Sequence, residues 1–104
     1  MKRFDLFGTK EQTLTETADA VARAIGVSFE LHESGYLGGE YFRSLGLEGE
    51  EVLVQANAED EEGYLTEPDF ADFPTLVYVN RGSEEFARAL EAVPELELLR
   101  SEAV

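Results

Sequence analysis

Carboxylates are the side chains of this protein most able to do chemistry, and they crowd into the middle of the sequence. Between Arg43 and Arg81 there is no lysine or arginine. The same stretch holds ten acidic residues, which are Glu48, Glu50, Glu51, Glu59, Asp60, Glu61, Glu62, Glu67, Asp69 and Asp72. Two carboxylates can act as general acid and general base if burial shifts the pKa of one of them. Because nearly all of these acids lie in polar loop sequence or at outward strand positions, we interpret them as solvated surface.

The single histidine, His32, limits the other routes to catalysis. One histidine excludes a multi-histidine metal site, and the absence of cysteine removes thiolate ligands and thiol nucleophiles. Ser28 and Ser34 lie near His32 in the sequence, but neither is surrounded by the pattern of a nucleophile elbow. We therefore interpret His32 as a strand residue on a polar face.

Two segments partly match ligand-binding loops. Residues 57–63 are rich in oxygen ligands, but placing Gly63 at the glycine of an EF-hand loop puts Ala58 where the first carboxylate must be. That mismatch leaves only weak, nonspecific binding of divalent ions. Gly38-Gly39 lacks the Lys and Ser/Thr of a phosphate-binding loop, and the adjacent Glu40 would repel a phosphate. We expect a turn or bulge there, and no cofactor.

The overall charge decides which partners can approach. The chain has 23 acidic and eight basic residues, a formal net charge of −15. Such a chain cannot neutralise the phosphates that dominate nucleic-acid affinity, and it would be repelled by anionic membranes. No apolar run is long enough to span a bilayer. A basic protein would be attracted, so the charge indicates binding rather than catalysis, and we expect no enzyme activity.

Periodicity and turn signals place the acidic stretch within an alternation of strands and helices. The sequence predicts strands at Lys2–Phe7, Val27–His32, Glu40–Leu45, Val52–Ala56, Thr75–Asn80 and Glu95–Leu98. Gly8 and Thr9 are expected to turn the chain after the first strand.

Helix signals follow the first and fifth predicted strands. Thr13 and Glu16 have the spacing of a capping box, and Gly26 is a natural stop for a helix ending at Ile25. Ser83 is expected to cap a second helix, whose buried face has Phe86, Leu90 and Val93, and Pro94 prevents its continuation.

The resulting order, β-α-β-β-β-β-α-β, favours an α+β fold with a mostly antiparallel sheet packed against two helices. We expect residues 1–104 to form a single domain with Thr75–Asn80, the most apolar strand, near the centre of the sheet. The lack of cysteine suits a reducing cytosol, and the first residues lack the apolar core of a signal peptide, so we expect a cytoplasmic protein. An edge strand could pair two copies while net charge opposes it, which predicts a monomer or weak dimer.

Residues 57–74 are a long polar connection with acids and aromatics interleaved. Connections of this length in a compact domain are usually functional or disordered. As a binding loop, its acids would attract a basic partner, and Tyr64, Phe70 and Phe73 would supply side chains that bury on contact. An equally good interpretation is a solvated loop whose Phe70 and Phe73 fold back onto the core.

Four segments carry a resemblance to a known group of proteins. These are HESGYLGGEYF (residues 32–42), VLVQAN (52–57), EPDF (67–70) and TLVYVN (75–80). In these segments and in the order of its elements, the chain resembles small acidic immunity proteins of bacterial polymorphic and contact-dependent toxin systems. The resemblance implies a compact, cytoplasmic, non-catalytic α+β domain that binds one cognate toxin domain, commonly a basic nuclease.

The leading hypothesis is therefore an immunity-type inhibitor that masks the active site of a basic toxin domain. The residues expected to bind the partner are Glu59, Asp60, Glu61, Glu62, Tyr64, Asp69, Phe70 and Asp72, with Tyr36 and Glu40 as a second patch. An acidic adaptor for another basic protein is the second interpretation. A small hydrolase or metal-dependent enzyme is the third, and it would need a buried, strongly shifted carboxylate in a pocket.

Overall fold

The computed structural model describes residues 2–34 and 39–103. Its elements are β1 (Arg3–Thr9), α1 (Leu14–Ile25), β2 (Glu30–Ser34), β3 (Gly39–Leu45), β4 (Glu51–Ala56), a 3-10 helix (Pro68–Phe70), β5 (Thr75–Gly82), α2 (Glu84–Glu91) and β6 (Glu97–Ala103). The predicted order of strands and helices is confirmed, and so is the α+β class.

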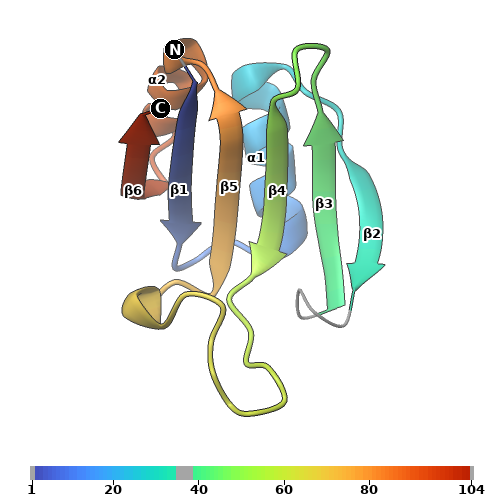
Figure 1. Ribbon diagram of the computed structural model, residues 1–104, viewed down its shortest axis with the longest axis vertical. Coiled ribbons are helices and arrows are strands. Elements are labelled where there is room, and N and C mark those ends of the chain that lie inside the picture. The colour runs from blue at the N-terminus through green and yellow to red at the C-terminus, as the bar shows by residue number, and fades with distance from the viewer. Residues whose placement is uncertain (1, 35–38, 104) are drawn as a thin grey trace.

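The strands form one six-stranded sheet in the order β2-β3-β4-β5-β1-β6, and every neighbouring pair is antiparallel. The most apolar strand, β5, lies between β4 and β1, as predicted. Figure 1 shows both helices behind one face of the sheet, while the other face, called here the open face, is turned toward the viewer. The sheet is therefore covered by helices on one side only.

The main core lies between the helices and the sheet, because alternate strand residues point to this side. It consists of Phe7, Val52, Val54, Val77 and Val79 from the strands, Ala18 and Val21 from α1, Leu90 from α2, and Leu96. Burying each Val, Leu or Phe side chain contributes about 1.5–3 kcal/mol to stability. This layer orients the sheet and so determines which side chains reach the open face.

Both helices begin as their sequences predict, and α1 also ends as predicted, whereas α2 ends at Glu91, before Val93. The Thr13 hydroxyl accepts a hydrogen bond from the Glu16 N–H, and the Glu16 carboxylate accepts one from the Thr13 N–H, which completes the capping box. Gly26 adopts the left-handed conformation at φ 69° and ends α1. Ser83 caps α2 by accepting a hydrogen bond from the Phe86 N–H.

The predicted turn at Gly8 and Thr9 is wrong, because β1 continues through both residues. Gly8 pairs with strands on both sides. A Cβ added there would lie 2.8 Å from the Leu99 side chain and 2.9 Å from the Phe73 ring. The glycine therefore lets two apolar side chains pack onto the strand, and it is not a turn residue.

The predicted bounds of the other strands also need correction: β3 and β4 begin one residue earlier than predicted, β5 continues to Gly82, and β2 and β6 differ most. The second strand begins at Glu30 rather than Val27, and Leu31, expected to be half-buried, is 56% exposed. Leu31 lies on the edge strand, which α1 does not cover (Figure 1). The last strand runs over Glu97–Ala103 rather than ending at Leu98, because β1 continues to pair with it.

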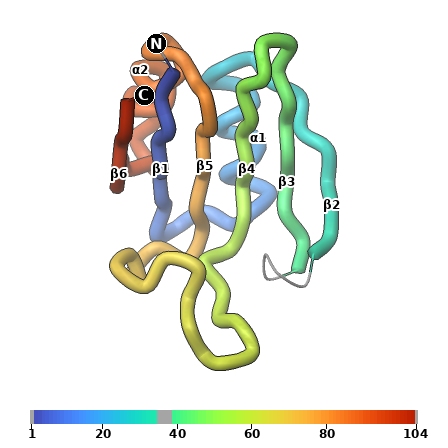
Figure 2. The backbone as a smooth tube through the Cα atoms, viewed as in Figure 1, coloured from blue at the N-terminus to red at the C-terminus, as the bar shows by residue number. Residues whose placement is uncertain are grey.

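A second, smaller core lies on the open face. Phe70 and Phe73 of the 57–74 connection pack there against Leu6 of β1, with Leu76, Tyr78 and Leu99 completing the cluster. Figure 2 shows the connection leaving β4, extending past the end of the sheet and returning to β5. Part of the connection thus covers the open face, and part of it protrudes.

Candidate functional site

The protruding part of the connection is a tight turn, called here the tip (residues 59–65). Its ends are joined by an antiparallel bridge between Glu59 and Leu65. The Asp60 carboxylate accepts hydrogen bonds from the backbone N–H groups of Glu62 and Tyr64, each 2.9 Å long. Gly63 adopts φ 86°, which a residue with a side chain rarely does. The tip is consequently shaped by its own hydrogen bonds.

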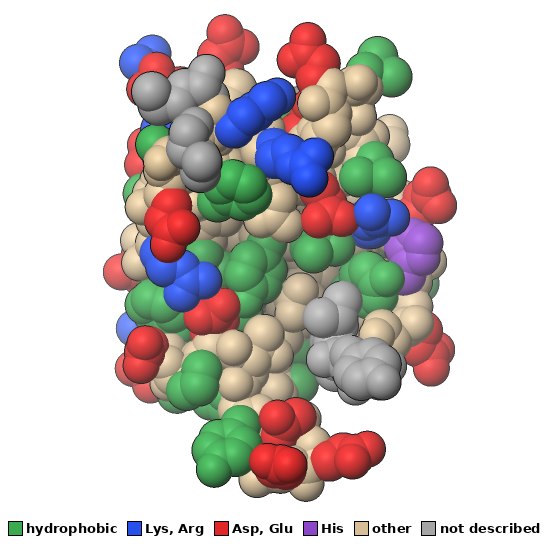
Figure 3. Space-filling view, in the orientation of Figure 1, with side chains coloured by type: hydrophobic (Ala, Val, Ile, Leu, Met, Phe, Trp, Pro, Cys, Tyr) green, Lys and Arg blue, Asp and Glu red, His purple; other side chains and the backbone are tan. Residues whose placement is uncertain are grey.

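The tip presents negative charge and one aromatic ring to solvent. Glu59, Asp60, Glu61 and Glu62 are all exposed. Within the described residues, none of them forms an ion pair with a lysine, arginine or histidine. Tyr64 is 64% exposed. Figure 3 shows the acidic side chains grouped beside a hydrophobic one at this end of the molecule. The four tip acids and Tyr64, which the sequence predicted as binding residues, are therefore brought together.

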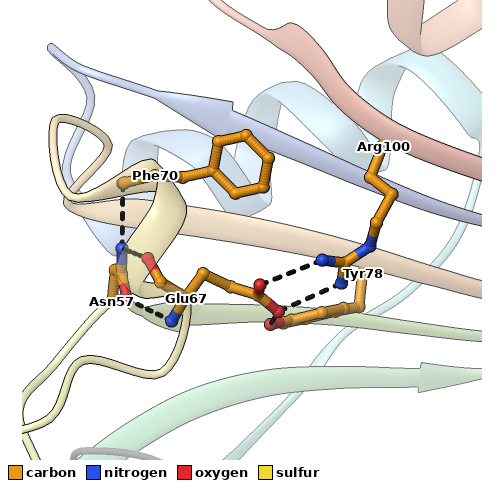
Figure 4. A network of polar contacts seen from close by, with 5 residues as sticks. All are labelled: Asn57, Glu67, Phe70, Tyr78 and Arg100. Carbon is orange, nitrogen blue, oxygen red and sulfur yellow. Dashed lines mark hydrogen bonds and ion pairs between the residues drawn. The ribbon is translucent and has the colours of Figure 1, made fainter.

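The base of the connection is held by the side chain of Asn57 (Figure 4). Its Oδ1 accepts a 2.9 Å hydrogen bond from the Glu67 N–H. Its Nδ2 donates to the carbonyl oxygens of Glu67 and Phe70 at 3.2 and 3.0 Å. One amide thus connects the two arms of the connection and positions the 3-10 helix that carries Phe70.

A second contact fastens the connection to the sheet. The Glu67 carboxylate accepts two hydrogen bonds from the Arg100 guanidinium of β6, each 3.1 Å, and another from the Tyr78 hydroxyl of β5 (Figure 4). Burial raises the pKa of Glu67, but the bonds from Arg100 and Tyr78 outweigh it, so the pKa lies below its ordinary value. Burial and the neighbouring carboxylate raise the pKa of Tyr78. We call this group the latch (Glu67, Tyr78, Arg100).

Sequence reasoning missed the latch, since its three members are far apart in the chain and match no motif. Glu67 looks like any other acid of the connection, and Arg100 lies 33 residues away in the sequence. The antiparallel pairing of β1 with both β5 and β6 brings Tyr78 and Arg100 to the same side. The one usable signal was a tyrosine at an alternate position of an otherwise apolar strand.

Glu51 is also held by partners. It accepts a 2.8 Å bond from Arg43 Nε and a 3.1 Å bond from Asn80 Nδ2. Burial raises the pKa of Glu51, but Arg43, Asn80 and the positive charge of Arg81 together lower it below its ordinary value. Glu51 and Glu67 are thus structural carboxylates rather than members of a free acidic surface.

The other predicted binding residues lie away from the tip. Asp69 and Asp72 are exposed on the returning arm. Phe70 is half-buried and Phe73 is 9% exposed, and both belong to the small core. Their positions therefore match the interpretation in which these rings fold back onto the core. Glu40 is exposed at the start of β3, at the same end of the sheet as the connection (Figure 1). Tyr36 lies outside the described residues.

The groups considered for catalysis do not converge. His32 stacks on Tyr41 with ring centroids 5.4 Å apart, and its Nε2 lies 3.8 Å from Glu30. Among the described residues, no three histidine or acidic side chains are grouped as metal ligands. The two carboxylates with a displaced pKa, Glu51 and Glu67, are both shifted downward, whereas a general acid requires an upward shift.

No protein-family model matches the chain, and searches of curated proteins and of solved structures also find no match. Within the described residues, none of the helices has the length and apolar character needed to cross a membrane.

Proposed function

We propose that this protein is a non-catalytic, cytoplasmic immunity protein that binds a cognate bacterial toxin domain and inhibits it by masking a basic active site. The observation that carries the proposal is the tip. It combines exposed carboxylates that form no ion pair among the described residues with an exposed tyrosine, on a segment whose shape is held by internal hydrogen bonds. The resemblance noted in the sequence supports the same function.

The charge of the tip suits rapid capture. Complementary charges steer two proteins together and raise association rates to about 10⁸–10⁹ M⁻¹s⁻¹ at low salt, from about 10⁵–10⁶ without steering. An inhibitor must reach its toxin before damage occurs, so a fast association is useful. The exposed carboxylates Glu59, Glu61 and Glu62 would provide this attraction, and Asp69, Asp72 and Glu40 would extend it.

The hydrogen-bonded turn of the tip suits tight binding. A loop that is already ordered loses little conformational entropy when it binds. Tyr64 would provide the aromatic anchor, because tyrosine is enriched among the residues that dominate interface energies. Asp60 would act mainly by holding the turn, and Phe70 mainly by fixing the connection to the sheet. Tyr36 stays in the proposal as part of a second patch with Glu40.

The first experiment is a pull-down from the native organism with tagged protein, washed at low and then high salt. A single basic, toxin-like protein that survives the high-salt wash supports the proposal and identifies the target. A single basic housekeeping factor would instead favour the adaptor. A diffuse set of basic proteins lost together at moderate salt would contradict both functions.

The second experiment tests the tip with the captured partner. The triple variant E59Q/E61Q/E62Q keeps Asp60 and therefore the turn. We expect its association rate to fall at least tenfold at low salt, with a flatter salt dependence. The matched control is E85Q/E91Q/E95Q, which removes the same charge from exposed positions in and just after α2. Equal association rates for the two variants would show that only net charge matters, and would remove the tip from the interface.

A further inference from the structure

The open face carries a hollow that the proposed function does not use. It has a volume of about 560 Å³ and is lined by Phe4, Arg43, Leu45, Gly49, Glu51, Asn80 and Arg81. Its size falls in the range of about 300–1,000 Å³ that is typical of ligand-sized clefts. It lies on the part of the open face that the small core leaves uncovered, near the turn between β3 and β4.

The charge of this hollow is the reverse of the charge of the molecule. Its lining has two arginines and one carboxylate, in a chain where acids outnumber bases 23 to eight. The carboxylate, Glu51, is already bonded to Arg43. Within the described residues, the Arg81 guanidinium has no ion pair, although Glu48 and Glu50 line the adjoining hollow with Lys2. The hollow thus suits an acidic group.

The backbone is strained at Arg81, the second arginine of the hollow. Arg81 is the one residue other than glycine with a positive φ, 59°, in the described part of the chain. It is the extra residue of a β-bulge, because Arg3 pairs with Gly82 while Phe4 pairs with Asn80. A bulge position with left-handed φ is usually occupied by glycine, and bulges redirect side chains. Here the bulge brings Arg81 to the hollow next to Asn80, instead of toward the helices.

The rest of the lining is apolar and accessible. Leu45 is 60% exposed and Phe4 is 36% exposed. An apolar wall beside an arginine fits a segment in which a carboxylate stands next to an aromatic ring. The tip of this same protein has that chemistry, with Glu61 and Glu62 close in sequence to Tyr64. Figure 1 shows that the tip protrudes at one end of the sheet and that the β3–β4 turn is at the other.

We propose that the hollow binds the tip of a second copy of this chain, with Tyr64 against Phe4 and Leu45 and a tip glutamate bonded to Arg81. Because donor and acceptor surfaces differ, the contact is head-to-tail and can extend to a third copy. The net charge of −15 opposes it, so the association is weak, and it is stronger at about 0.15 M salt than at low salt. At about 0.15 M the Debye length is about 8 Å, which damps long-range repulsion more than a direct contact. This docking would compete with toxin for the tip, but it does not depend on the proposed function.

The test uses sedimentation of the full chain up to about 1 mM, the dissociation constant expected of a weak contact. The hollow variant is L45S/R81G, in which glycine accepts the left-handed backbone. The tip variant is E61Q/E62Q/Y64S. We expect wild type to exceed the monomer mass at high concentration, and each variant alone to remain monomeric. The controls R88A and E85Q/E91Q alter exposed charges on α2 and should still associate, with E85Q/E91Q at least as strong as wild type because it carries less negative charge.

Mixing the two variants is the decisive step. The tip variant keeps an intact hollow and the hollow variant keeps an intact tip, so the mixture should form a 1:1 heterodimer and stop there. A wild type that stays monomeric at about 1 mM would refute the proposal. Variants that associate as well as wild type, or a mixture that stays monomeric, would refute it equally. None of these outcomes depends on whether a toxin is found.

Discussion

The latch offers the sharpest test of how the connection is held, through the substitution Glu67→Gln. Glutamine keeps the length of the side chain and removes the charge that Tyr78 and Arg100 share. The Glu67 side chain is 15% exposed and that of Arg100 is 46% exposed. The substitution therefore affects a nearly buried acceptor and a half-exposed ion pair.

The expected loss follows from these exposures. A hydrogen bond to a charged group, here from Tyr78, contributes about 1.5–3 kcal/mol. An ion pair with a half-exposed partner contributes about 0.2–1 kcal/mol. Together they give about 2–4 kcal/mol at pH 7, or a fall in Tm of roughly 10–20 °C for a domain of this size. Tyr78→Phe and the double variant complete a cycle, with a coupling of about 1–2 kcal/mol.

The pH dependence of E67Q provides an internal check. Because the folded-state pKa of Glu67 lies below its ordinary value of 4.5, its contribution is fully present above that value and is lost as pH falls through the folded pKa. The difference in free energy of unfolding between wild type and E67Q should thus shrink as pH is lowered below 4.5. Urea denaturation from neutral to acidic pH measures it.

Hydrogen exchange identifies the backbone amides that lose protection when the latch is broken. In E67Q we expect faster exchange of the backbone amides of residues 57–74, with protection of β4 and β5 retained until global unfolding. The control is Glu61→Gln, an exposed acid of the same connection that forms no ion pair among the described residues. If E67Q and E61Q have the same Tm and the same exchange in residues 57–74, the latch does not hold the connection and the reasoning is wrong.

Three further predictions concern single positions. As pH rises past 10, wild type should lose stability relative to Tyr78→Phe in urea titrations, because the raised pKa keeps the folded-state tyrosine protonated after the unfolded one ionises. Thr13→Ala should cost about 1 kcal/mol in urea denaturation through loss of the α1 cap; an unchanged midpoint would contradict the capping-box assignment. Arg81→Gly should be about 1 kcal/mol more stable than Arg81→Ala by thermal denaturation, since alanine keeps the left-handed strain; equal Tm values would show no strain.

Most of the fold could be predicted because its signals are local. Capping at Thr13 and Ser83 depends on residues within one turn of each helix, and alternation in β5 depends on immediate neighbours. The predictions failed at positions whose structure depends on contacts with segments far away in the sequence. The sequence predicted a turn at Gly8, but the glycine lies within a strand, where the side chains of Phe73 and Leu99 occupy the space that a Cβ would need. Leu31 reads as half-buried, but its strand is at the edge of the sheet.

The candidate site was predicted in part for the same reason. The acids and Tyr64 of the tip are consecutive or nearly so, and a turn brings them together without help from the rest of the chain. The sequence could not decide between two positions for Phe70. Its ring packs against the cluster of Leu6, Phe73 and Leu76, and this cluster exists only once the sheet has formed.

The sequence by itself determined the charge of the surface, the order of the elements and the chemistry of the tip, because these depend on composition and on neighbours in the chain. Tertiary structure alone decided which carboxylates are free. Glu67 reaches Arg100 and Tyr78, and Glu51 reaches Arg43 and Asn80, through strand pairings between distant segments. It also decided that Arg81 turns to the open face. A bulge places it there, and a bulge is a property of two paired strands rather than of one.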